Sequence, residues 1–150
     1  MATVTITTNI DQVFKNMASS FELLKDKEYF LRPLAVETIP NMKERIHKDG
    51  HATDNTPIGT YSNGYMRVRE ENKRGKDTKI IVSLTRQLEN DWAVLPTNTG
   101  YGIGFNNPIN KDKAKWVEEN KSKIIFNLSE AEKKYISERI QELVNGAINS

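Results

Sequence analysis

The segment that decides the fold is Ile80–Phe105, which reads IIVSLTRQLENDWAVLPTNTGYGIGF. Its β-branched and apolar residues, with those just before it, fall into three runs, at 78–84, 92–95 and 100–105. Runs of this length and composition are typical of strands, and the residues that separate them are typical of turns. The segment therefore predicts a small antiparallel sheet within about residues 78–105.

The third run alternates large side chains with glycine: Tyr101, Ile103 and Phe105 against Gly100, Gly102 and Gly104. Because successive residues of a strand point to opposite faces, the glycines are expected to leave one face bare. A bare face is typical of a place where another backbone packs closely. The glycine spacing does not fit a dinucleotide-binding fingerprint, which opens a helix instead of lying inside a strand.

Helical patterns precede this segment. Val4 and Ile6 alternate with threonines, which favours a short β segment or an extended arm, and apolar residues then recur at helical spacing over 10–25. A second helix is expected over about 28–47, with one apolar face made of Leu31, Leu34, Ala35, Thr38, Met42 and Ile46. Pro33 and Pro40 predict a kink or two shorter helices, unless Pro33 lies in the first turn.

Two further helices are expected after the sheet. Residues 111–121 form a short charged helix whose apolar anchors are Ala114, Trp116 and Val117. Ser129 and Glu132 fit a capping box, and a last apolar face follows it, made of Ile136, Ile140, Leu143, Val144 and Ala147. The chain is therefore predicted to be one α+β domain over 1–150, with N-terminal and C-terminal helices packed on the sheet.

Residues 49–77 are expected to form a long loop. Asp49-Gly50 closes the second helix, with Gly50 as a left-handed residue, and Asn63-Gly64 is a strong turn signal. So long an irregular stretch is uncommon inside a compact domain and is usually functional or disordered. We interpret it as an exposed loop that becomes ordered in an assembly.

Composition excludes several classes of function. The chain has 150 residues, a net charge of only +2 and no cysteine, which excludes disulfides, thiolate metal sites and cysteine nucleophiles. Its apolar runs are too short for a membrane span, and the first eight residues do not resemble a secretion signal. We therefore expect no membrane partner and a protein that is made and used in a cytoplasm.

Candidate catalytic and metal-binding residues are few. His47 and His51 are four apart, with Asp49 and Asp54 nearby, but Gly50 should break the helix that would bring the histidines together. The acidic residues Asp54, Glu70, Glu71, Glu89 and Asp91 have no spacing that fixes them as an acid–base pair. We expect no enzyme, no cofactor and no metal, with a small hydrolase using His47 or His51 as a remote alternative.

A basic and aromatic cluster lies in the long loop. Tyr61, Tyr65, Arg67 and Arg69 stand together, and residues 65–79 contain six basic and three acidic residues. Stacking of the tyrosines on nucleic-acid bases is one reading of this cluster. The other is a protein interface, where aromatic residues and arginine are enriched. Most charged segments of this kind are simply solvated.

The order of motifs carries a resemblance. It runs R-I-H-K-D-G (45–50), I-G-T-Y-S (58–62), V-S-L-T-R-Q-L-E-N-D-W (82–92), Y-G-I-G-F (101–105) and I-I-F-x-L-S (124–129). Over about residues 25–146 the chain resembles the virion morphogenesis, or tail completion, proteins of tailed bacteriophages and prophages, in particular those of Bacteroides-like bacteria. Leu84, Thr85, Leu88, Trp92 and Val94 match the family segment that follows its basic loop.

The resemblance implies a structural protein that forms a ring in the neck or at the head-proximal end of the tail. Its partners would be copies of itself and the neighbouring connector, neck and tail proteins, with DNA passing through the ring. It would be found in the virion after assembly in the host cytoplasm. The residues we expect at the assembly interface are Tyr61, Tyr65, Arg67, Arg69, Arg86, Trp92 and Tyr101. A nucleic-acid-binding module that uses the basic–aromatic loop at 61–76 is the alternative.

Overall fold

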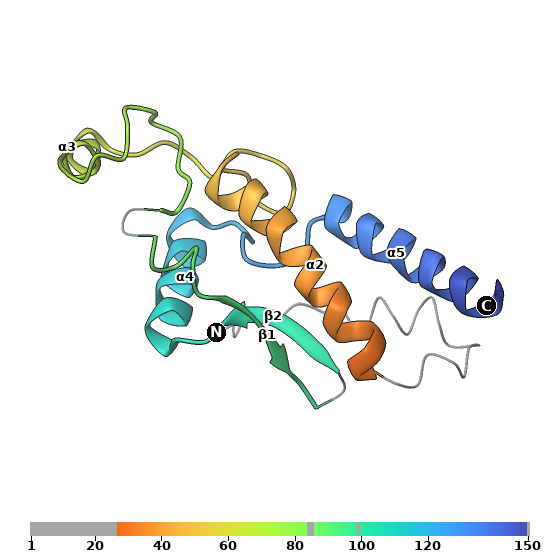
Figure 1. Cartoon of the computed structure of the whole chain (residues 1–150). Helices are drawn as coiled ribbons and strands as arrows, with labels where there is room; N and C mark the ends of the chain where they lie inside the picture. The colour runs from red at the N-terminus through yellow and green to blue at the C-terminus, as the bar shows by residue number, and fades with distance from the viewer. Residues whose placement is uncertain (1–26, 84–85, 99, 150) are drawn as a thin grey trace.

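A computed structural model of the chain describes residues 27–83, 86–98 and 100–149 (Figure 1). The helix expected over 10–25 and the β segment expected at Val4 and Ile6 lie outside these residues. The described part contains four helices and a two-stranded antiparallel sheet, which confirms the α+β class. The elements are α2 (Lys27–His47), α3 (Asn63–Glu71), β1 (Trp92–Pro96), β2 (Tyr101–Phe105), α4 (Pro108–Lys121) and α5 (Glu130–Asn149).

Helix α2 is the central element of the arrangement. It contacts α5 on one side and both strands on the other, while α4 packs near β2 (Figure 1). The strands pair in register, with Trp92 opposite Phe105 and Val94 opposite Ile103. Helix α3 lies apart from the other helices, at one end of the molecule (Figure 1).

The apolar face predicted for α2 is confirmed. Its six members are all fully or almost fully buried: Leu31, Leu34, Ala35, Thr38, Met42 and Ile46. The prediction of two shorter helices is wrong, because α2 runs as one helix through Pro33 and Pro40, and Pro33 does not lie in its first turn. A kink at the prolines stays a prediction. Both prolines are exposed, so the carbonyl groups that lose a helical N–H donor lie on the side that water reaches.

The strand expected at 78–84 is reduced to a single bridge between Thr60 and Lys79. Two backbone hydrogen bonds flank it, from the N–H of Tyr61 to the carbonyl of Thr78 at 2.7 Å and from the N–H of Ile80 to the carbonyl of Gly59 at 2.9 Å. The extended run then ends at Val82, whose φ of 49° lies in the left-handed region. That conformation is costly for a β-branched residue and cannot continue a ladder.

The loop expected at 49–77 contains helix α3. Asn63 and Gly64, which we expected to form a turn, are instead the first two residues of this helix. Ser62 is its N-cap, with Oγ accepting a hydrogen bond from the N–H of Tyr65 at 3.2 Å. A serine N-cap satisfies one of the free N–H groups at a helix start, and this local signal outweighs the turn preference of Asn-Gly.

Helix α4 begins three residues earlier than expected, at Pro108. The proline stops β2 and also opens the helix, since the first helical position needs no N–H donor. Asn107 caps the helix by accepting a hydrogen bond from the N–H of Ile109 at 2.9 Å. Asp91 accepts two more, from the Asn107 N–H at 2.8 Å and the Asn110 side chain at 2.9 Å, which ties the helix start to the residue before β1.

The core forms two adjoining clusters. One joins α2 to α5 and the sheet, and its buried members include Leu34, Met42, Ile103 and Ile136. The other is built around Phe105 and Phe126, whose ring centroids are 5.8 Å apart. Gly102 and Gly104 of β2 are buried as well, which agrees with the close packing expected on the face that carries glycines instead of side chains.

A buried ion pair joins four separate parts of the chain. The side chain of Arg45, near the end of α2, is 9% exposed and that of Glu132, in the first turn of α5, is 5% exposed. Arg45 donates Nε to Glu132 at 2.7 Å and Nη2 to the same carboxylate at 3.1 Å. Its remaining N–H groups go to the carbonyls of His51 at 3.1 Å, Ile125 at 3.1 Å and Asn127 at 2.7 Å. All five donors of this guanidinium therefore have an acceptor.

The same carboxylate completes the predicted capping box. Glu132 accepts the backbone N–H of Ser129 at 3.1 Å, and the Ser129 hydroxyl accepts the N–H of Glu132 at 3.2 Å. A neighbouring buried carboxylate, Glu118 of α4, accepts the N–H groups of Ile125 and Phe126 at 2.7 and 2.8 Å. The connection between α4 and α5 is thus held by two carboxylates and one guanidinium.

Replacing Arg45 with methionine should lower the free energy of unfolding by about 3–5 kcal/mol, because Glu132 and three carbonyls lose their partner inside the protein. Lys48 lies one turn away and its side chain is 75% exposed, so Lys48→Met is the matched control. It should change the free energy of unfolding by less than about 0.5 kcal/mol. Chemical denaturation followed by circular dichroism measures both variants. Equal losses in the two would contradict this role for Arg45.

Gly50→Ala should destabilise the fold by about 2 kcal/mol or more. Gly50 has a φ of 70°, as expected, and a Cβ there would overlap the carbonyl oxygen of Ile80. Gly64→Ala is the control, since a Cβ at this helical position meets nothing within 4 Å and alanine is the better helix former. Melting temperatures should fall for the first variant and stay equal or rise for the second.

Candidate functional site

A groove with a volume of about 1100 Å³ lies between α3 and α4 on the described surface. Its walls come from the segment that leads into α3, from residues 80, 82, 83 and 86–88, and from the outward side of α4. Ile80 and Leu88 at its base belong to the core, and Val82 lines it with its left-handed backbone. We call this feature the α3–α4 groove.

Large apolar side chains of this groove remain exposed. Trp116 is 64% exposed, Ile109 is 62% exposed and Tyr65 is 38% exposed, and all three line the groove. Ile109 and Trp116 are seven residues apart on α4 and so share one face of that helix. Exposed apolar side chains that line one groove make it a candidate site for a binding partner.

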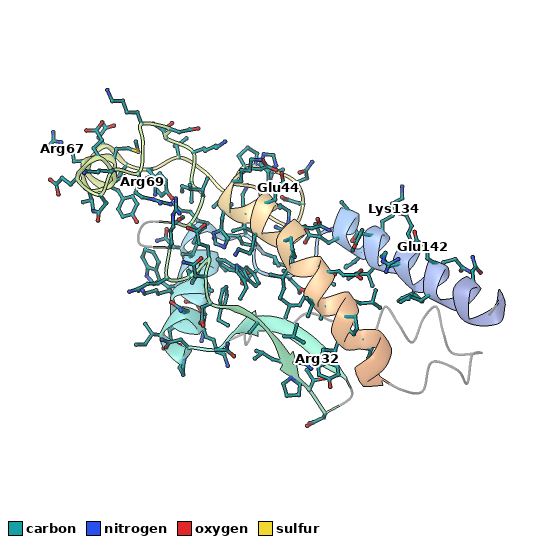
Figure 2. All side chains as sticks on the ribbon, in the orientation of Figure 1. Arg32, Glu44, Arg67, Arg69, Lys134 and Glu142 are labelled. Carbon is teal, nitrogen blue, oxygen red and sulfur yellow. The ribbon has the colours of Figure 1, made fainter. Side chains whose placement is uncertain are left out.

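The basic–aromatic cluster is divided by the structure. Figure 2 shows Arg67 pointing away from the body of the protein and Arg69 pointing back toward it. Arg69 is only 2% exposed, with its guanidinium carbon 4.5 Å from the centre of the Tyr61 ring. It donates to the Tyr61 hydroxyl at 3.3 Å and to the carbonyl of Ser83. Arg69 therefore anchors α3 to the rest of the chain, and Tyr61 packs against Tyr65 with centroids 4.9 Å apart.

A second arginine sits behind the groove wall. Arg74 donates Nη2 to the Ser83 hydroxyl at 2.6 Å, and that hydroxyl donates to Glu89 at 2.7 Å. Glu89 is also within 3.7 Å of Arg74 Nη2 and within 3.6 Å of Arg86 Nε. Arg86 itself is 66% exposed and lines the groove. Three of the expected interface residues, Tyr61, Tyr65 and Arg86, thus come together at one site.

The other expected interface residues lie elsewhere. Arg67 is exposed on the far side of α3, and Tyr101 is half-buried at the start of β2 against the core. Trp92 packs inside the protein, with ring centroids 4.4 Å from Phe105 and 6.1 Å from Phe126. A role for these residues in assembly stays a prediction.

Trp92 also completes a buried hydrogen-bonded chain. Its indole N–H donates to Nε2 of His47 at 3.0 Å, and Nδ1 of His47 lies 3.1 Å from the carbonyl oxygen of Ile81. Only a neutral imidazole with its proton on Nδ1 satisfies both contacts. Burial lowers the pKa of His47 below its ordinary value of 6.5, and the bond to the Ile81 carbonyl opposes that effect in part.

Two of the remaining candidates for chemistry, His51 and Asp54, have structural partners. Nδ1 of His51 lies 3.2 Å from the side-chain oxygen of Asn55. Asp54 accepts hydrogen bonds from the backbone and the hydroxyl of Thr56, and these bonds lower its pKa. Among the described residues no group of three or more histidine or acidic side chains is placed to hold a metal ion.

No helix in the described ranges is long and apolar enough to cross a bilayer. Comparisons of the chain with protein-family models, with curated proteins and with solved structures found no match. The groove is therefore interpreted from its own residues and from the motif order.

Sequence reasoning did not single out Ile109, which is 62% exposed in the groove. It expected Trp116 to be an apolar anchor of α4, whereas Ala114 is the apolar residue that this helix buries and Trp116 lies on the exposed side. The available signal was the spacing of Ile109, Trp116 and Val117, which forms a second apolar stripe beside the one through Ala114.

Acidification should destabilise the protein through His47. Because its pKa is lower in the folded chain than in the unfolded one, the unfolded chain binds more protons, and stability falls as pH drops below 6.5. The loss of stability levels off once the pH is below the pKa that His47 has in the folded chain. Urea unfolding between about pH 7.5 and pH 5 measures this slope.

His47→Gln, which keeps an acceptor for Trp92 but does not titrate, should flatten the slope in that window. His51→Gln serves as the matched control and should retain it. A slope that is the same in the wild type and His47→Gln would show that other groups cause the pH dependence.

Proposed function

We propose that this protein is a structural subunit of a tailed-phage virion, a tail completion or head–tail joining protein that assembles as a ring. The observation that carries the proposal is the α3–α4 groove, where Tyr65, Ile109 and Trp116 present apolar surface to solvent. An exposed apolar group of this kind is typical of a protein–protein interface. The ordered succession of motifs that resembles tail completion proteins supplies the class of assembly.

The geometry of the subunit suits this role. Helix α3 projects from one end of the molecule (Figure 1). The groove lies between it and α4. A contact that joins two different surfaces can close into a ring when the rotation between subunits allows it. We infer that the α3–α4 groove receives one partner and that the contact between copies uses another surface of the subunit.

The nucleic-acid alternative is weakened by the placement of its residues. Of the side chains in the 61–76 loop that it would use, Arg69 is buried, and Arg74 is held by Ser83 and Glu89. The hydroxyl of Tyr61 accepts hydrogen bonds from Arg69 and from the N–H of Ile81. Stacking on bases requires free aromatic faces beside free cations. The described residues favour the protein interface.

The purified protein should form a ring-shaped oligomer, alone or when mixed with the connector or tail tube proteins encoded beside it. Light scattering measures the mass of the particle, and negative-stain electron microscopy shows whether it is closed. A protein that stays monomeric at all concentrations and binds neither partner would refute the proposal. A gene located between those of the connector and the major tail protein would be an independent check.

A further inference from the structure

The rim of the α3–α4 groove is predominantly basic. Arg86, Lys113 and Lys121 line it, against the single acidic residue Asp112. Arg86 is 66% exposed, and Lys113 is held across the groove by the side-chain oxygen of Gln87 at 3.2 Å. The charged residues that line the groove therefore carry a net charge of +2 (three cations and one carboxylate) around an apolar floor, which equals the net charge of the whole chain.

The wall behind the rim adds to this excess. The guanidinium groups of Arg69 and Arg74 both donate to Ser83. Glu89 is the one carboxylate that the described contacts bring to this group, and it pairs with Arg74 and with Arg86. The buried Nε atoms of Arg69 and Arg74 have no hydrogen-bond partner among the described residues. A partly buried cluster with surplus positive charge is stabilised by an added anion, because uncompensated buried charge is costly.

The shape of the groove favours a polypeptide over a small ligand. Small-molecule sites enclose most of their ligand's surface. Here Ile109 and Trp116 lie open, at 62% and 64% exposure, along one stripe of α4. Two large apolar side chains seven residues apart on one helix face have the spacing of the apolar residues with which an amphipathic segment binds along a groove.

We propose that the α3–α4 groove binds an acidic amphipathic segment of a protein other than this chain. Apolar side chains of that segment would pack against Trp116, Ile109 and Tyr65, and its carboxylates would pair with Arg86 and Lys113. The inference rests on the proposed function only in treating the protein as a joining subunit, and it identifies the chemistry of the neighbour that the groove receives.

A second copy of this chain is a poorer occupant on the described surface. The large apolar side chains exposed outside the groove are Val36, Val68 and Ile124. They lie on α2, on α3 and after α4, so each would enter a groove singly. Ile124 also follows Lys123 directly, which brings a cation toward a basic rim.

Binding to two peptide pools tests the proposal. Both pools carry varied apolar side chains along one helical face, flanked by aspartate or glutamate in one pool and by lysine or arginine in the other. The protein should select acidic peptides, and the best of them should bind about tenfold more tightly than its basic counterpart at low salt. Fluorescence anisotropy of labelled peptides measures both affinities.

Charge reversal identifies the groove as the site. Arg86→Glu with Lys113→Glu should reverse the preference, so that basic peptides bind more tightly than acidic ones. Lys133→Glu with Lys134→Glu on α5 changes the net charge equally, away from the groove, and should leave the preference intact. Persistence of the acidic preference in the groove variant would overturn the proposal.

Two truncations test the apolar anchors. Trp116→Ala should weaken the acidic peptide on the order of thirtyfold, as expected for a central aromatic anchor. Ile109→Ala should weaken it too, whereas Ile124→Ala, at the same 62% exposure, should not. If Trp116→Ala instead lowers the mass of the oligomer and leaves peptide affinity unchanged, the occupant is a second copy and the proposal is wrong.

The two proposals fail separately. A folded protein that forms rings but binds neither pool, or binds both equally, would overturn the groove assignment and leave the proposed function standing. A monomer that binds neither connector nor tail tube proteins, yet selects acidic peptides at the groove, would overturn the proposed function and leave the groove assignment standing.

Discussion

The guanidinium of Arg45 is the contact on which the rest of the structure depends. Its five N–H groups reach Glu132 and the carbonyls of His51, Ile125 and Asn127. These acceptors lie on three different segments. Without this side chain the buried carboxylate of Glu132 would lose its positive partner, and each of the three carbonyls would lose a hydrogen bond. The end of α2, the start of α5 and the connection before α5 therefore hold one another in place, and the two apolar clusters pack around them.

The surface that we assign to binding depends on a second arginine. Arg69 fastens α3 to Tyr61 and Ser83, in a part of the chain with few apolar residues of its own. The segment before α3 and the segment after it meet at one bridge, between Thr60 and Lys79. Side-chain contacts thus hold together the two segments that strand pairing would join in a regular sheet. These contacts leave the apolar stripe of α4 uncovered.

The sequence predicts those features of this structure that arise from residues close together in the chain, and it does not predict those that arise from contacts between distant segments. Hydrophobic periodicity and helix capping depend on residues that are close together in the sequence. The residues alone therefore predicted the buried face of α2, the β1–β2 pair and the capping box of Ser129 and Glu132. The left-handed conformation of Val82 and the burial of Arg69 were not, because both arise from contacts between segments. The groove combines three expected residues with Ile109 and Trp116, whose exposure depends on which side of α4 meets the core.

The hydrogen bonds from Arg69 to both Tyr61 and Ser83 affect the conformational entropy that the groove loses when it binds a ligand. These two residues line it from different segments, and one buried side chain fixes their separation. The receptor surface is thereby preorganised, so little conformational entropy is lost on its side when a ligand enters. The ordering cost of association then falls mainly on the incoming segment, and mutations that stiffen that segment would raise affinity more than mutations that stiffen the groove.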